Sequence, residues 1–116
     1  MALHTMWTHG TTVRVAENAG GTYWFHFTIP TPCRQARLLR VLLLWEARSG
    51  AHPLALHVLD GPNRIAELPM TLPVDGLSRF ELDPHAITSS VGVSVGVAFD
   101  RDGDITFFAA GAAFDA

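Results

Sequence analysis

Hydrophobic and polar residues alternate along most of this chain, and the alternation predicts β-strands. Successive side chains of a strand point to opposite faces, so apolar residues at every second position mark one buried face. From residue 22 to 29 an aromatic or isoleucine side chain stands at each odd position, and from 91 to 99 a valine or phenylalanine does so. We expect further strands at 11–16, 37–47, 54–59, 64–68, 77–82 and 105–114.

Clusters of Gly, Pro, Asn and Asp between these segments predict where the chain turns, because these residues suit turn conformations. We expect turns at 18–21, 60–63 and 83–85, and a stop at 30–32, where prolines cannot donate to a strand ladder. Asp102-Gly103 is predicted to close a hairpin between the last two strands.

The segment 37–47 is open to two interpretations, because it is almost continuously apolar. A helix could place Leu38, Leu42 and Trp45 on one face, and leucine and arginine favour helix. The segment has no capping residue immediately before it, and strands surround it. We therefore expect a strand that is buried on both faces.

Short strands at this spacing, about eight in all, indicate one all-β domain covering residues 1–116. The expected fold is a two-layer antiparallel β-sandwich, jelly-roll-like or Ig-like, and the alternative is a small β-barrel. Among 116 residues, 48% are hydrophobic and only 16% are charged, so polar groups can hardly cover the outside. We expect another subunit or a ligand to cover some apolar surface, with a homo-oligomer as the first choice.

Composition excludes several classes of chemistry. All eight cationic side chains are arginine, which rules out a Schiff-base lysine and a P-loop lysine. A net charge of −3 without a basic patch argues against a nucleic-acid partner. Cys33 has no second cysteine to pair with, and neither a signal peptide nor a membrane-spanning apolar run is evident. The expected location is the cytoplasm, without a membrane partner.

Two motifs match catalytic or metal-binding strings only as text. Residues 92–96 spell G-x-S-x-G, but Ser94 stands inside a regular strand pattern rather than at a strand-to-helix turn. Asp100, Asp102 and Asp104 resemble the start of a calcium loop, yet the required glycine and glutamate are missing. A polar turn is the expected structure there, with a weak cation site as the alternative. The six histidines are scattered, so we expect no metal centre and no cofactor.

The candidate site residues stand on predicted strands. His26 and His57 lie mid-strand beside bulky apolar residues, and Glu46 is the one carboxylate in a strongly apolar strand, so the three could form acid–base pairs. Small residues alternate with valine in 92–98 and predict a shallow groove into which a large side chain, a subunit or a ligand could pack. Trp24, His26 and Trp45 are the expected ligand-binding residues beside it, because tryptophan on a strand face can stack on sugars or other flat ligands.

Four segments carry a resemblance: W-F-H-F-T-I-P-T-P at 24–32, M-W-T-H-G at 6–10, H-V-L-D-G-P at 57–62 and V-G-V-S-V-G-V at 91–97. On these segments the chain resembles a group of small bacterial proteins of unknown function that carry a W-F-H-F-x-I-P-T-P segment. The resemblance spans nearly the whole chain. It implies a single all-β domain with these strand positions, and it implies no activity, ligand or catalytic residue.

Two functional hypotheses remain open. The first is a binding or assembly module that self-associates through an apolar sheet face and presents a groove for a small apolar or carbohydrate ligand. It requires a filled interior and an apolar contact between chains. The second is a small biosynthetic enzyme of the cyclase or isomerase type, with His26, His57 and Glu46 as catalytic candidates. It requires a closed pocket of several hundred cubic ångströms that contains a histidine or an acid.

Overall fold

The computed structural model describes residues 3–15, 21–33, 35–70 and 76–115. Every regular element in these ranges is a β-strand, so the strand interpretation of 37–47 is confirmed and the helical one is wrong. The strands are β1 (Leu3–Val15), β2 (Gly21–Ile29), β3 (Arg37–Asp60), β4 (Asn63–Pro69), β5 (Gly76–Ala86) and β6 (Val91–Asp115).

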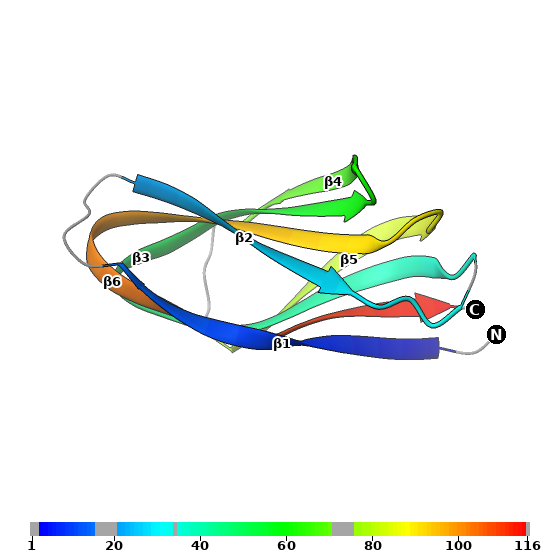
Figure 1. The fold of residues 1–116 in the computed structure, drawn as a ribbon, viewed down its shortest axis with the longest axis horizontal. Coiled ribbons are helices and arrows are strands. Elements are labelled where there is room, and N and C mark those ends of the chain that lie inside the picture. Colours follow the sequence, from blue (N-terminus) through cyan, green and yellow to red (C-terminus); the bar gives the residue numbers. More distant parts are fainter. Residues whose placement is uncertain (1–2, 16–20, 34, 71–75, 116) are drawn as a thin grey trace.

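Two of these strands, β3 and β6, are long enough to belong to both layers of a sandwich. They pair with each other along their whole length and bend at the same end of the molecule (Figure 1). The first half of β3 and the second half of β6 lie between β1 and β5, and we call this layer the β1 sheet. Their other halves lie between β2 and β4, in the layer we call the β2 sheet. The predicted two-layer antiparallel sandwich is thus confirmed.

The pairing defines a jelly roll. When β3 and β6 are each counted as two segments, the eight segments in chain order form sheets of order 1-8-3-6 and 2-7-4-5. An Ig-like fold would place its first two strands in one sheet, whereas β1 and β2 lie in different sheets. Among the described residues neither β1 with β2 nor β4 with β5 forms a ladder, so the barrel alternative is also wrong.

The predicted hairpin at Asp102-Gly103 is wrong, because β6 runs through this position and bends from one sheet into the other. Ser49 pairs with Gly103 and Ala51 with Phe99, so residues 100–102 of β6 face a single residue of β3. A Cβ atom on Gly103 would lie 2.7–2.8 Å from three backbone atoms of β3. The glycine is therefore needed for close contact between two bending strands, not for a tight turn.

The predicted turn at 83–85 is also wrong, since β5 continues to Ala86. Leu38 pairs with His85 and Arg40 with Glu81, so β5 takes up the proline of this segment in a bulge. An edge strand tolerates proline because one side of its backbone has no ladder partner. The turn at 60–63 is confirmed, with Gly61 at a φ of 59°, and the predicted turn at 18–21 falls mostly outside the described residues.

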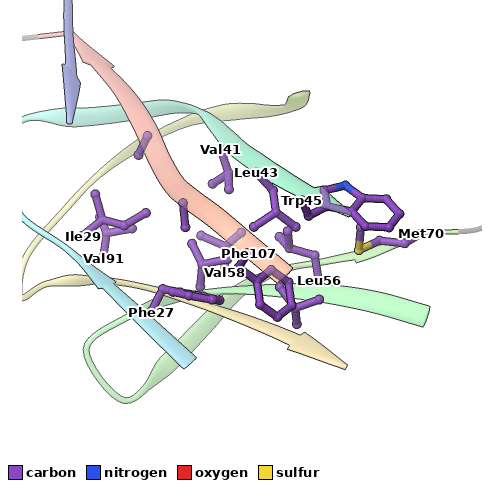
Figure 2. Packing of buried hydrophobic residues seen from close by; sticks show 14 of the residues in the cluster. Phe27, Ile29, Val41, Leu43, Trp45, Leu56, Val58, Met70, Val91 and Phe107 are labelled. Atoms are coloured by element: carbon purple, nitrogen blue, oxygen red, sulfur yellow. The ribbon is translucent and has the colours of Figure 1, made fainter. Parts of the chain in front are cut away.

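The core fills the space between the sheets. Figure 2 shows side chains of both layers pointing into one cluster. The inward residues of β2, β3 and β6 supply most of it, including Phe27, Ile29, Leu38, Val41, Leu43, Trp45, Leu56, Val58, Phe99, Phe107 and Phe114. The predicted burial of 37–47 on both faces holds only in part on the outer face, where Leu42 is buried and Leu44 is exposed.

Candidate functional site

Three predicted site residues come together on the outer face of the β2 sheet. Trp24 and His26 are two positions apart on β2, and His57 is on the second half of β3. Between them runs β6, which pairs Gly96 with Trp24 and Ser94 with both histidines. The small residues of 92–98 thus form the floor between β2 and β3, as the predicted groove requires.

The indole of Trp24 lies flat on the glycine of this floor. A Cβ atom on Gly96 would lie 2.9 Å from Cη2 and Cζ2 of Trp24, so only glycine allows the ring to approach this closely. The ring of His57 packs against the indole at a centroid distance of 4.6 Å and an angle of 35°. Trp24 nevertheless keeps 43% of its surface exposed, so part of the indole is open to a ligand.

Polar groups of the site are found on all four strands of the β2 sheet. His26 Nδ1 and Ser94 Oγ are 2.5 Å apart and share a hydrogen bond whose donor depends on the imidazole tautomer. On the other side, His57 Nε2 lies 3.6 Å from a carboxylate oxygen of Glu67, which lies equally close to Arg64. The carboxylate contacts the histidine that does not bond to Ser94, so these residues do not form a Ser-His-acid triad.

Trp45 and Glu46 do not belong to this site, which corrects their assignment as a ligand-binding and a catalytic partner of His26 or His57. Trp45 is 1% exposed, its indole lies among the core side chains (Figure 2), and its Nε1 donates a hydrogen bond to Ser78 Oγ at 2.9 Å. Glu46 is in the β1 sheet, paired with Arg48. The bend of β3 separates both residues from His57.

The outer face of the β1 sheet carries a second tryptophan on a glycine. A Cβ atom on Gly111 would lie 2.6 Å from Cε3 of Trp7, and the two residues are paired between β6 and β1. Three more apolar side chains are exposed on the same sheet face, and the exposed fractions are 45% for Trp7, 36% for Leu44, 46% for Leu77 and 52% for Phe108. We call these four residues the apolar patch.

Register places three of the four side chains together, and it puts Trp7, through Gly111, in line with Leu42, two positions before Leu44 on β3. Leu44 pairs directly with Leu77 on β5 and with Ala109 on β6. The pairing of β3 with β6 shifts between Leu44 and Trp45, which gives β6 one extra residue, Phe108. This bulge turns Phe108 outward beside Leu44 while its neighbour Phe107 stays in the core.

Two hollows among the described residues lie away from the predicted catalytic residues. An open hollow of about 830 Å³ is lined by the segment after β2 and by the loop between β5 and β6. A second, of about 460 Å³, is lined by β4 and β5 and includes Glu81, Asp83 and His85. His26, His57 and Glu46 line neither of these two hollows, which are open to solvent.

A buried carboxylate holds the loop beside the larger hollow. Asp60 is 3% exposed and accepts hydrogen bonds from the backbone N–H and hydroxyl of Thr88 and from the N–H of Ser89, at 2.8–3.0 Å. Burial alone would raise the pKa of Asp60, but these bonds and the nearby His85 outweigh it and lower the pKa below its usual value. Asp60, the aspartate of the H-V-L-D-G-P segment, thus has a structural role, because its hydrogen bonds hold the 87–90 loop in place.

Within the described residues, no group of three or more His, Cys, Asp or Glu is placed to hold a metal ion. The possible cation site cannot be placed, since the side chains of Asp100 and Asp102 are outside the described part of the chain. The search of the described residues for a helix long and apolar enough to cross a membrane found none. Comparison with family models, curated proteins and solved structures produced no match.

Sequence reasoning missed Glu67, Trp7 and Gly111, whereas Gly96 lies in the predicted groove of 92–98. One signal could have found the second tryptophan: Trp-x-His occurs at 7–9 and again at 24–26, and the two copies lie on β1 and β2. These strands flank β6 at equivalent places in the two sheets. The glycines needed the register of β6, and Glu67 needed the register of β4 against β3.

Proposed function

We propose that this protein is an assembly module that forms a homodimer through the outer face of its β1 sheet. The observation that carries the proposal is the apolar patch, in which four large side chains are exposed on one sheet face. Exposing contiguous apolar surface to water is unfavourable, and such patches are characteristic of contact surfaces. A second copy supplies a matching apolar face, because a two-fold dimer places the same patch on both sides.

Charge on this face supports a second copy as the partner. Arg40 is paired with Glu81 at 2.6 Å, and Arg48 is paired with Glu46 at a similar distance. Because these two arginines each have an anion on the same face, they add little like-charge repulsion when two copies approach. The interior also supports a module, since apolar side chains of both sheets form one core cluster and His26, His57 and Glu46 are not part of it. With one cysteine, which is exposed and free, we place the protein in the cytoplasm.

Light scattering coupled to size exclusion tests the dimer. The wild-type mass is expected at twice 12.6 kDa, and Leu44→Asp, which puts a charge at the centre of the patch, is expected to shift it to the monomer. Leu54→Asp is the matched control, because Leu54 is also an exposed leucine, at 48% against 36% for Leu44, on the half of β3 that belongs to the β2 sheet. A monomeric wild type, or dissociation of the Leu54 variant alone, would contradict the proposal.

A further inference from the structure

On each of the two outer faces a tryptophan side chain packs on a glycine, but the neighbouring side chains differ. Trp7 lies on Gly111 among exposed apolar side chains, whereas Trp24 lies on Gly96 among histidines, a serine and a carboxylate. Covering a glycine explains why each indole lies flat on its sheet. It does not explain the cluster of His26, Ser94, His57 and Glu67 beside Trp24, and these polar groups point to a ligand.

The groups around Trp24 match a ligand that has an apolar face and a polar edge. The exposed part of the indole offers a flat apolar surface, and His57 borders it on the side of β3. The bond of His26 to Ser94 uses Nδ1, so Nε2 is the ring nitrogen that can reach a ligand. The carboxylate of Glu67, exposed at the far side of His57, adds acceptors.

Electrostatics favours an uncharged ligand. Glu67 is within 3.6 Å of both Arg64 and His57, so the carboxylate has cationic or polar neighbours on the same face. An anionic ligand would meet Glu67, and a cationic ligand would compete with Arg64 for it. A neutral ring with hydroxyls at its edge avoids both costs and can donate to the carboxylate and to an imidazole nitrogen.

We propose that the outer face of the β2 sheet binds a pyranose sugar, whose C–H face stacks on Trp24 while its hydroxyls bond to His26, His57 and Glu67. The face is shallow, with a floor of Gly96 and Ser94, so it suits one ring of a glycan that extends beyond the site. A single stacked ring with few hydrogen bonds implies weak binding, with a dissociation constant on the order of 1 mM. This site is independent of the apolar patch, which lies on the other sheet.

Two-dimensional ¹H–¹⁵N NMR with methyl pyranosides of glucose, galactose, mannose and N-acetylglucosamine tests the site. At least one of the four is expected to shift the indole N–H signal of Trp24 in a saturable way and to leave that of Trp7 unchanged. Trp24→Ala is expected to abolish the shifts of the remaining site signals, whereas Trp7→Ala, the matched change on the other sheet, is expected to keep them. The amide spectrum of each variant reports whether it is folded.

A second pair of variants keeps the test independent of the indole. His26→Ala is expected to weaken binding about fivefold, and Thr28→Ala, an exposed neighbour on the same face of β2, is expected to leave it unchanged. Saturation with none of the four sugars, or binding that survives Trp24→Ala, overturns the proposal. The Leu44→Asp variant separates the two proposals: sugar binding by its monomer supports this site whatever the fate of the dimer, and loss of binding there contradicts the site's independence.

Discussion

At the scale of single residues, the glycines have two different structural roles: one allows a turn with positive φ, and the others allow close packing of an aromatic ring. Gly61 adopts a φ of 59° in the turn between β3 and β4, where a side chain would be strained and would also meet Ser89. Gly96 and Gly111 have no such backbone, and instead leave room for an indole. Composition alone therefore cannot reveal which glycines support a turn and which support a functional surface.

Asp60→Asn is expected to destabilise the fold by about 2 kcal/mol at pH 7, because the carboxylate accepts several hydrogen bonds while nearly buried. The pKa of Asp60 in the folded state is lower than its value of 3.8 in a free chain. A carboxyl with a lowered pKa stabilises the fold fully above the unfolded value, and this stabilisation is lost as pH falls through the folded value.

Urea unfolding from pH 7 to pH 2.5 checks this prediction. The gap between wild type and Asp60→Asn is expected to be constant from pH 7 to about 5 and to shrink below pH 4. Asp83→Asn, which removes an exposed carboxylate from β5, serves as the control. A gap that stays constant down to pH 2.5 would show that the charge of Asp60 is not the stabilising feature.

Trp45→Phe is expected to lower the free energy of unfolding by about 1–3 kcal/mol, because it leaves a cavity in the core and removes the hydrogen bond to Ser78. Since Trp45 lies inside the sandwich, the substitution should leave sugar titrations at Trp24 unaltered. Denaturation and NMR titration of the same sample measure both effects. Loss of sugar binding in a folded Trp45→Phe protein would mean that this residue serves the site after all.

At the scale of elements, alternation predicts most strands, and the failures occur where local turn residues compete with sheet pairing. Asp102-Gly103 and the proline segment of β5 both have the composition of turns. In the folded chain they are a bend and a bulge, because the strands on either side are already paired with β3. Sequence patterns within a few residues cannot reveal such pairing between residues that are far apart in the chain.

The same bend explains which part of the candidate site could be predicted. Trp24, His26 and His57 are correctly placed on strands, and their outward positions follow from alternation. Grouping them with Trp45 and Glu46 fails because β3 changes sheets at residue 50, between those residues and His57. A 24-residue strand that serves two sheets looks, in the sequence, like two separate strands.

Gly103→Ala tests the bend directly. Its Cβ would meet Ala51 N, Arg48 O and Gly50 N, which are backbone atoms that cannot rotate away, so we expect a loss of about 2–3 kcal/mol in the free energy of unfolding. Gly92→Ala is the control on the same strand, because the nearest atom to its Cβ, on Leu59, is 3.7 Å away. Guanidinium denaturation of the two variants measures the difference, and equal stabilities would contradict a close crossing of β3 and β6.

At the scale of the whole molecule, the jelly roll leaves two broad sheet faces on opposite sides of an elongated body of 47 × 24 × 22 Å (Figure 1). The fold alone does not select a function, because jelly rolls serve in assembly and in sugar recognition alike. Any choice between these functions must therefore be argued from the residues on the two outer faces. If both proposals hold, the apolar patch on one sheet and the polar aromatic site on the other would let one copy contact its partner and a ligand at the same time.

If the β1 sheet is the contact between copies, folding and assembly are linked, and the melting temperature must depend on protein concentration. A partner that binds only the folded chain stabilises it by mass action. For a domain of this size, a tenfold rise in concentration above the dissociation constant should raise the melting temperature by about 3 °C. Leu44→Asp should remove this dependence, because it breaks the apolar contact, while Leu54→Asp should retain it.

Calorimetry at two scan rates separates this equilibrium effect from irreversible unfolding, since only irreversible unfolding shifts with scan rate. A wild-type melting temperature that stays constant across a hundredfold range of concentration would mean that the apolar patch faces water in solution, and the homodimer would have to be abandoned.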